Sequence, residues 1–299
     1  MYRLVVLATL AVLAAGSARA ELPGPLVDAA WLAANRAAVR VVEVHPDGPG
    51  EATIPGAAVV GMDELRESRA VGDERFDRLA LAPAAFETLM ARLDVDGDDA
   101  VVVSWTGEGA SGASDAAYLY WQLRYYGHDA VALLDGGIQA VAPVAAEMAA
   151  PAPEAGPAFS AQPRSGFHIT TPALATLVAE GAPALVDNRP LAFHVGLARK
   201  SYVARDGHIP GSTLFPFTFM VKGGEAPVFH TPERFERLAL DLGVPEGAPL
   251  IVYCNSGRVS ALGWFVLSEL LGREAILYDG SLHAWAQDEA RPMSTALMR

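Results

Sequence analysis

Residues 250–260 of this chain read Leu-Ile-Val-Tyr-Cys-Asn-Ser-Gly-Arg-Val-Ser. The apolar start predicts a buried strand and the part after the glycine predicts a helix, so Cys254, the single cysteine of the chain, lies at their junction. A thiol at the carboxyl end of such a strand faces free backbone N–H groups and the positive end of the helix dipole. Arg258 adds a fixed positive charge. These surroundings favour a thiolate nucleophile in an anion-binding loop, although a lone cysteine is otherwise typical of a small buried hydrophobe.

The composition limits the kind of protein that this chain can be. It has 299 residues, of which 52% are hydrophobic, and this is enough for two domains with separate cores. Its formal net charge is -13 and no run of lysine or arginine occurs, which argues against nucleic acid as a partner. The seven histidines and one cysteine show no H-x3-H or C-x2-C spacing. We therefore expect no bound metal and no other cofactor.

Residues 1–20 have the features of a secretory signal peptide. Arg3 stands near the start, an apolar run covers residues 4–15, and an Ala-x-Ala pattern ends at Ala20. The run is too short to span a bilayer, and nothing later resembles a membrane helix. We expect cleavage near Ala20 and a periplasmic or secreted protein without a membrane span; a retained N-terminal anchor is the alternative. One cysteine cannot form an internal disulfide, so the thiol stays free for chemistry or pairs with another molecule.

The chain contains an internal duplication. Three signals of the first half recur in the same order about 145–149 residues later. They are a helix start at Pro83 and Pro232, an apolar strand at residues 101–105 and 250–254, and an Asp-Gly pair at residues 135–136 and 279–280. Such a repeated order indicates two copies of one structural unit.

This repeat sets the expected domain organisation. In each copy, short Val/Ile/Leu runs alternate with helical periodicity, which is typical of α/β domains with a parallel sheet covered by helices. Residues 143–166 between the copies are rich in Ala, Pro and Gly and predict a linker. We expect one domain over residues 21–142 and a second over residues 167–299. Ligands of such sheets bind beyond the carboxyl ends of strands, where Cys254 lies.

The second copy resembles the tandem-domain rhodanese sulfurtransferases. The resemblance rests on Val-Asp-Asn-Arg at residues 186–189, Gly-His-Ile-Pro-Gly-Ser at 207–212, the C-x-x-G-x-x-S loop at 254–260, and Tyr-Asp-Gly-Ser at 278–281. The first copy resembles the catalytically silent N-terminal domain of these proteins, with Trp105 in the place of the cysteine. The resemblance implies two rhodanese-like domains, each a parallel sheet flanked by helices, with chemistry in the second domain alone.

The same resemblance implies the reaction of a sulfurtransferase. A cysteine thiolate, here Cys254, takes a sulfur atom from a small anionic donor, holds it as a persulfide, and passes it to a thiol or to cyanide. A protein that accepts the sulfur is a further candidate partner. We expect the loop to hold the thiolate and the persulfide through Asn255, Ser256, Gly257, Val259 and Ser260. For Ser260, capping of the following helix is the alternative.

Two arginines are expected to bind the donor anion. Arg258 follows the glycine of the loop, and Arg189 matches the substrate-binding arginine of the family. Each would stabilise negative charge on the donor through a charge-assisted hydrogen bond. The alternatives are a solvated loop residue for Arg258, and for Arg189 a salt bridge to Asp187 or Asp206.

Two other functions fit parts of the sequence. Residues 107–112 read Gly-Glu-Gly-Ala-Ser-Gly and Asp135 follows the next strand, as in a dinucleotide site. The second copy has the same layout without the glycines, so the duplication is the better explanation. Cysteine phosphatases of the same fold place an arginine six residues after the cysteine, whereas Arg258 comes four residues after Cys254. The shorter loop favours a single sulfur atom over phosphate.

We expect the donor to be thiosulfate. The form Cys-Asn-x-Gly-Arg-x-Ser resembles small periplasmic thiosulfate sulfurtransferases. Ser256 fits the serine of 3-mercaptopyruvate sulfurtransferases, but Asn255 and Arg258 do not fit, and no histidine stands near Asp77 in the sequence to complete the relay that those enzymes use. The alternatives are a 3-mercaptopyruvate sulfurtransferase and a periplasmic persulfide carrier that turns over little with small donors.

Overall fold

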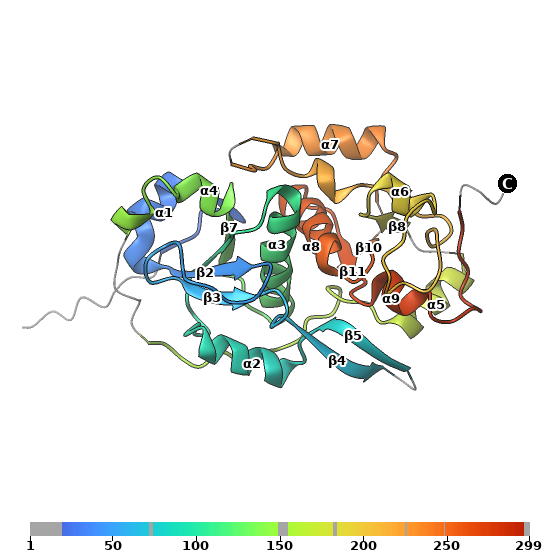
Figure 1. The fold of residues 1–299 in the computed structure, drawn as a ribbon, viewed down its shortest axis with the longest axis horizontal. Coiled ribbons are helices and arrows are strands. Elements are labelled where there is room, and N and C mark those ends of the chain that lie inside the picture. The colour runs from blue at the N-terminus through green and yellow to red at the C-terminus, as the bar shows by residue number, and fades with distance from the viewer. Residues whose placement is uncertain are drawn as a thin grey trace, which may run out of the picture.

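The computed structural model describes residues 20–71, 74–148, 155–181, 184–224, 226–247 and 249–295. Two parallel sheets lie on either side of the central helices α3 (Gly109–Tyr125) and α8 (Arg258–Trp264), and further helices flank each sheet (Figure 1). This arrangement confirms the predicted α/β fold with two helix-flanked parallel sheets.

The first sheet has the strand order β1-β7-β6-β2-β3, and each neighbouring pair is parallel. Its central strands are rich in valine because both faces of the sheet are covered. The strands are β1 (Leu26–Val27), β2 (Arg40–His45), β3 (Ala58–Gly61), β6 (Val101–Trp105) and β7 (Val131–Leu134). Besides α3, its helices are α1 (Ala29–Asn35), α2 (Pro83–Arg92) and α4 (Gly137–Val141), with short turns η1 (Arg36–Ala38) and η2 (Ala145–Met148).

The second sheet is smaller, with the parallel order β11-β10-β8-β9. Its strands are β8 (Ala184–Asp187), β9 (Thr213–Leu214), β10 (Leu250–Tyr253) and β11 (Ala275–Leu277). Besides α8, its helices are α5 (Thr171–Ala179), α6 (Leu191–His194), α7 (Pro232–Asp241) and α9 (Ser281–Trp285). A short turn, η3 (Phe217–Phe219), follows β9, and a π-helical segment, η4 (Phe265–Leu270), continues α8.

The duplication is visible in the order of the elements. Strands β6 and β7 and helices α2, α3 and α4 of the first half recur as β10, β11, α7, α8 and α9. Both α2 and α7 begin with a proline, which lacks the N–H that a first helical turn leaves unpaired. The predicted ranges 21–142 and 167–299 each enclose one of the two parallel sheets.

The predicted linker packs along the first domain where it is described. The N–H of Gly97 donates to the Pro157 carbonyl at 2.8 Å, and the N–H of Ala161 donates to Glu87 of α2 at 2.9 Å. Phe159 places its ring 5.5 Å from that of Phe86, edge to face. Residues 149–154 of the predicted linker lie outside the described residues.

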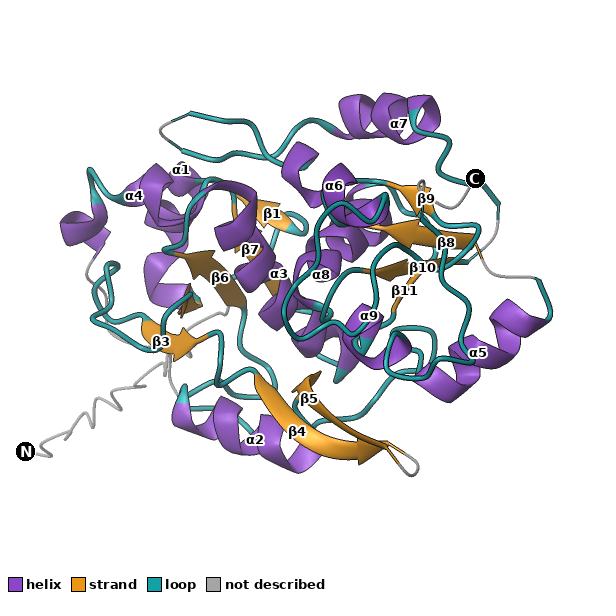
Figure 2. Cartoon of the chain, turned by 45° about the vertical axis from the view of Figure 1, so that its right-hand side comes forward, coloured by secondary structure: helices purple, strands orange, loops and turns teal. Residues whose placement is uncertain are grey.

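A hairpin of the first domain crosses to the second domain. It consists of β4 (Arg66–Val71) and β5 (Glu74–Ala80), and Figure 2 shows it reaching beneath α9 and α5. Phe76 and Leu79 are buried in the same cluster as Leu282 and Trp285 of α9. The N–H of Ala80 donates to the Asp279 carboxylate at 2.6 Å. The second domain therefore completes its core with side chains from the first.

The predicted signal peptide covers residues 1–20, of which residues 1–19 lie outside the described residues. Among the helices that are described, none has the length and apolar character needed to cross a membrane.

Candidate active site

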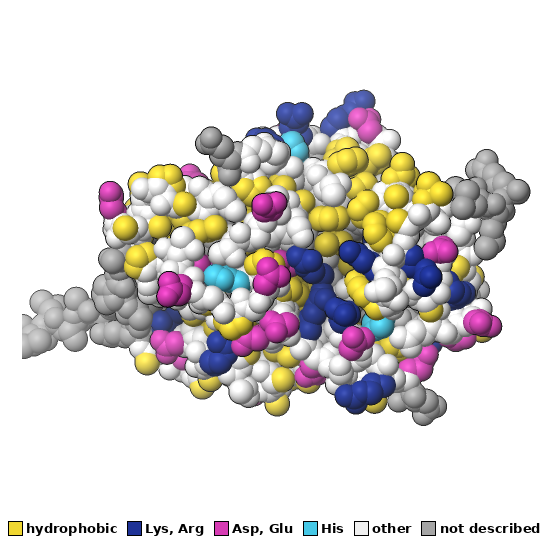
Figure 3. Space-filling view, viewed as in Figure 1, with side chains coloured by type: hydrophobic (Ala, Val, Ile, Leu, Met, Phe, Trp, Pro, Cys, Tyr) yellow, Lys and Arg dark blue, Asp and Glu magenta, His cyan; other side chains and the backbone are white. Residues whose placement is uncertain are grey.

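Cys254 lies directly after β10 and lines a cavity of about 220 Å³. Its side chain is buried, with 2% of its surface exposed. Among the described lining residues, the charged side chains are Arg189, Lys200 and Arg258, and none is a carboxylate. On the face shown in Figure 3, lysine and arginine side chains gather near the centre, between the two halves of the molecule. The cavity therefore suits a small anion beside a thiol.

The loop after Cys254 turns sharply at Gly257. This glycine has φ +77°, and a Cβ there would lie 2.2 Å from an oxygen of Asp279. A side chain at this position would therefore collide with the buried carboxylate. Helix α8 starts at the next residue, so the N–H groups of Val259 and Ser260 belong to its first turn and have no partner within the helix.

Only part of the predicted loop is free to bind a sulfur anion. Outside the helix, no described residue accepts a hydrogen bond from the N–H groups of Asn255 and Ser256. The N–H of Gly257 instead donates to Ser281 Oγ at 3.0 Å. Ser260 Oγ donates to the Gly257 carbonyl at 2.9 Å, so this hydroxyl neither caps α8 nor bonds to the cysteine sulfur. The structure therefore does not have the capping alternative, while the bond of Ser260 to a persulfide stays a prediction.

Ser281, the first residue of α9, is a site residue that sequence reasoning missed. Its Oγ accepts the N–H groups of Cys254 and Gly257, both at 3.0 Å, and lies 4.0 Å from the Cys254 sulfur. The same hydroxyl donates to the Tyr278 carbonyl at 2.8 Å. Ser281 has φ +48°, a left-handed conformation that a non-glycine residue adopts at a cost. A hydroxyl of α9, which is not part of the loop, thus fixes the loop conformation around the thiol.

Arg189 is both a cavity residue and half of a buried salt bridge. Its Nη2 lies 2.6 Å from Asp187 Oδ2, its Nε lies 2.9 Å from Asp187 Oδ1, and the Gly207 carbonyl accepts a further bond at 2.8 Å. Burial disfavours the guanidinium charge, but Asp187 outweighs it and raises the pKa of Arg189, and Cys254 acts in the same direction. The salt bridge to Asp187 that sequence left as an alternative is therefore present, beside the thiol.

Asp187 keeps its charge in a fully buried position. Burial alone would raise its pKa, but hydrogen bonds from His194 and Arg189 lower the pKa below its usual range. His194 Nδ1 lies 2.9 Å from Asp187 Oδ2, and its ring stacks on that of His208 with centroids 3.8 Å apart. The two histidines thus help to position Asp187, which in turn positions Arg189.

Arg258 bridges the two domains and is not a solvated loop residue. Its guanidinium forms a bidentate pair with Asp115 of α3 and also contacts the hydroxyl of Ser111 at 3.1 Å. Burial opposes its charge, but Asp115 raises the pKa of Arg258. Burial also raises the pKa of Asp115, and the guanidinium acts against that rise. The side chain stays 31% exposed and also lines the cavity beside Cys254.

A histidine of the second domain is hydrogen-bonded to an aspartate of the first-domain hairpin. His283 Nε2 is hydrogen-bonded to Asp77, and Nδ1 lies 2.8 Å from the carbonyl of Tyr202. Both ring nitrogens of His283 therefore have a partner, one in each domain. The backbone N–H of His283 donates to the Asn255 carbonyl at 2.8 Å, and the Tyr202 hydroxyl lies 3.4 Å from Ser256 Oγ. The histidine that sequence did not find near Asp77 comes from α9.

The comparisons with known proteins agree with this geometry. A family model described as the rhodanese-like domain matches residues 170–288, within the second domain. A relative from Mycolicibacterium smegmatis, provisionally named a thiosulfate sulfurtransferase, is 30% identical over 210 residues, covering 66% of this chain and 71% of the relative. The chain belongs to the rhodanese-like sulfurtransferases.

Two further relatives show how widely the likeness extends. The 3-mercaptopyruvate sulfurtransferase of Escherichia coli is 27% identical over 276 residues, which cover 87% of this chain and 94% of the relative. The crystal structure of SseA from Escherichia coli, titled as a 3-mercaptopyruvate sulfotransferase, superposes with a TM-score of 0.67 at 23% identity, covering 86% of this chain and 98% of that one. Both likenesses include the two domains of a tandem rhodanese-like sulfurtransferase.

In the first rhodanese-like domain, the glycine pattern at residues 107–112 has a packing role. A Cβ at Gly112 would lie 2.3 Å from the Gly107 carbonyl oxygen and 2.6 Å from the Trp105 ring. Asp135, the acid of the dinucleotide alternative, accepts the N–H of Phe229 from the second domain at 2.8 Å. Packing and domain contact therefore account for these residues without a nucleotide.

Proposed function

We propose that this sulfurtransferase uses thiosulfate as its donor. The observation that carries the proposal is the set of cationic side chains around the thiol. Lys200 lines the cavity without an ion-pair partner among the described residues, and Arg189 and Arg258 line it as well, although each also pairs with a buried carboxylate. Thiosulfate is a small dianion, and charge-assisted hydrogen bonds to arginine favour it over a donor with a single charge such as 3-mercaptopyruvate. Sequence relatives provisionally named thiosulfate sulfurtransferases support the same donor.

The proposed reaction exchanges one sulfur atom in two steps. The Cys254 thiolate attacks the outer sulfur of thiosulfate, a new S–S bond forms, and sulfite leaves with the electron pair of the broken S–S bond. Arg189 and Arg258 stabilise the charge on the sulfite. In the second step cyanide or a thiolate attacks the outer sulfur of the persulfide and regenerates the Cys254 thiolate. The free N–H groups of Asn255 and Ser256 stabilise the persulfide anion between the steps.

A second donor, 3-mercaptopyruvate, is supported by the Escherichia coli relative named for it and by one structural observation. Its transfer leaves an enolate of pyruvate that must gain a proton, and the Asp77–His283 pair stands behind Tyr202, whose hydroxyl is 3.4 Å from Ser256 Oγ. In this chain the histidine that would pass on the proton comes from α9 of the second domain, and not from the hairpin that carries Asp77. A persulfide carrier with little turnover is the third candidate.

Steady-state kinetics with both donors and cyanide as acceptor tests the proposal. We expect a higher kcat/KM with thiosulfate, and a protein mass increased by one sulfur atom after incubation with thiosulfate alone. Loading without turnover would favour the carrier. A higher kcat/KM with 3-mercaptopyruvate, lost in His283→Gln and retained in the matched variant His128→Gln of the first domain, would favour the other donor.

We also propose that the protein is exported and cut near Ala20. The basic start and apolar run of residues 1–20 support this. Expression of the full chain followed by N-terminal sequencing of the periplasmic fraction tests it, and an intact N-terminus would overturn it.

A further inference from the structure

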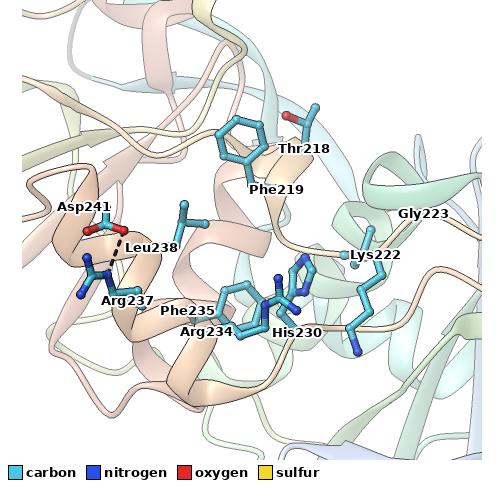
Figure 4. A pocket seen from close by; sticks show the side chains of 11 residues that line it. Thr218, Phe219, Lys222, Gly223, His230, Arg234, Phe235, Arg237, Leu238 and Asp241 are labelled. Carbon is cyan, nitrogen blue, oxygen red and sulfur yellow. Dashed lines mark hydrogen bonds and ion pairs between the residues drawn. The ribbon is translucent and has the colours of Figure 1, made fainter.

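A second cavity, also lined by described residues, lies away from Cys254. It is a groove of about 590 Å³ between η3 and α7, named here the η3–α7 groove. Figure 4 shows Lys222, His230 and Arg234 close together at one end, and Arg237 bonded to Asp241 at the other. The apolar part of its lining is Phe219, Val221, Phe235 and Leu238. The groove thus combines an apolar floor with a cationic end.

The lining of the groove carries more basic than acidic side chains. Arg237 pairs with Asp241 at 2.9 Å, but neither Lys222 nor Arg234 has an ion-pair partner in the described part of the chain. His230 lies between them with a buried Nδ1 that no described residue bonds. Its pKa is lowered first by burial and then by the charges of Arg234 and Lys222. Lys222 also faces the carboxylate of Asp135; burial raises the pKa of Asp135, and the charge of Lys222 acts against that rise. Among the described lining residues, Asp241 is the one carboxylate beside Lys222, Arg234 and Arg237, so a local positive potential remains that an anion would relieve.

The groove shares a wall with the active site. Phe217 of η3 lines the Cys254 cavity, and the next two residues, Thr218 and Phe219, line the groove. Phe219 is 47% exposed although it is a large apolar side chain. In Figure 3, hydrophobic side chains cover the surface between the central cluster of lysine and arginine and the upper edge that α7 forms in Figure 1. A molecule seated in the groove would therefore stand beside the entrance to the cavity.

We propose that the η3–α7 groove is the docking site of a protein that accepts sulfur from Cys254, and that it binds a segment with carboxylates next to an apolar side chain. The inference rests on the proposed sulfur transfer. A small anion in the groove could not take part in the reaction, because Cys254 does not line it, whereas a bound protein can present a cysteine to the neighbouring cavity. The chain carries a formal net charge of -13, so an acidic partner is repelled elsewhere and oriented by this patch.

Binding of a labelled peptide tests the docking site without any donor. The probe is a fluorescent peptide that joins a cysteine through a Gly-Ser spacer to a Leu/Phe/Glu segment, and its control has lysine in place of each glutamate. We expect fluorescence anisotropy to show at least about tenfold tighter binding of the acidic peptide at low salt, with the difference shrinking as salt screens the charges. No binding of the acidic peptide up to about 1 mM, or equal binding of both peptides, would overturn the proposal.

Matched charge changes locate the binding. Lys222→Glu with Arg234→Glu should abolish the preference for the acidic peptide, and Lys222→Gln with Arg234→Gln should weaken it. The control Arg92→Glu changes an exposed arginine on α2, on the opposite side of the molecule from α7 (Figure 1). An equal loss in the control, or none in the groove variants, would overturn the proposal. Free acetylglutamate displacing the peptide at equal concentration would do the same, because it would indicate a small-anion site.

Kinetics separates this proposal from the proposed donor. With cyanide as acceptor, the groove variants should keep kcat/KM within about twofold of the unmodified enzyme, whereas transfer to the acidic cysteine peptide should fall at least about tenfold. Absence of thiosulfate turnover with cyanide would refute the donor alone, since the anisotropy measurement stands without it. Equal losses with cyanide and peptide would overturn the docking site.

Discussion

The two strand-to-helix loops of this molecule have the same place in the fold and opposite contents. In the second domain, the small thiol of Cys254 leaves a cavity, and Ser281 at the start of α9 draws two loop N–H groups together. In the first domain, Trp105 fills the equivalent space, and the residue at the start of α4 is Gly137. A Cβ at Gly137 would lie 2.6 Å from the indole. The duplication therefore preserved the topology, while side-chain volume decided which copy holds a site.

The first domain contributes to the active site from its surface. Asp115 of α3 binds Arg258, Asp77 of β5 binds His283, and Arg66 of β4 donates to the Ser256 carbonyl at 3.1 Å. The strand-to-helix loop of the first domain is filled by Trp105, but these three side chains stabilise the loop and the cavity wall of the second domain. Substitutions in the two domains test these different roles, from the largest expected effect to the smallest.

The largest effect is expected for Cys254→Ser. A hydroxyl cannot form a persulfide, so sulfur transfer should fall at least about a thousandfold. Because the side chain changes little in volume, the melting temperature should stay within about 2 °C. Adding Trp105→Cys to this variant should restore nothing, since the N–H groups of the first loop are not gathered at that position. Transfer measured in either variant would contradict the assignment of the nucleophile.

Arg189→Gln should cause the largest loss of stability. It leaves the buried carboxylate of Asp187 without its bidentate partner, and breaking such a pair costs about 3–5 kcal/mol. Urea unfolding measures this free energy. The double variant Arg189→Gln with Asp187→Asn should recover most of the stability, because no buried charge remains. If Arg189 also binds the donor, kcat/KM for thiosulfate stays low in the double variant; recovery of both quantities would make Arg189 purely structural.

The third test exchanges the residues that begin α9 and α4. Ser281→Ala leaves two loop N–H groups without their acceptor and should lower the free energy of unfolding by about 1–3 kcal/mol, with a fall in kcat. The reverse change, Gly137→Ser, places a side chain against Trp105 and should cost about 1–3 kcal/mol through overpacking, without affecting kcat. Equal kinetic effects of the two changes would show that the loops are not functionally different.

A double-mutant cycle measures the contact between the domains. Asp115→Asn and Arg258→Gln should show a coupling of about 1 kcal/mol in unfolding, since the arginine is partly exposed and solvent screens the pair. Arg258→Gln should lower kcat/KM for thiosulfate even when Asp115 is already changed, because the guanidinium also lines the cavity. A kinetic effect that vanishes in the Asp115→Asn background would limit Arg258 to domain contact.

The smallest effect concerns pH. Burial opposes ionisation of Asp77, but its bond to His283 prevails and lowers the pKa of Asp77 in the folded protein. A lowered pKa contributes stability above the unfolded value of about 3.9, and this is lost as pH falls through the folded value. The unmodified protein should therefore lose up to about 0.5 kcal/mol more than Asp77→Asn on acidification, since the side chain is half exposed. Parallel stability curves would show that the pair is uncoupled.

The duplication, the fold class and the position of the thiol could all be predicted from local patterns in the sequence. Apolar runs fix parallel strands, and prolines mark the starts of α2 and α7, because burial and backbone geometry act over a few residues. Cys254 could therefore be placed at the end of β10 without any coordinates. The salt bridge between Arg189 and Asp187 could be named as an alternative because the two residues are near in sequence.

The groups that surround the thiol could not be predicted in this way, because most of them come from distant parts of the chain. Ser281 stands 27 residues after Cys254, Asp115 stands 143 residues before Arg258, and Asp77 stands 206 residues before His283. No local pattern links such pairs, because the helix or strand that carries each partner does not itself require that side chain. Their meeting depends on how α3 packs against α8 and how the β4–β5 hairpin crosses the domain boundary, and long-range burial sets both.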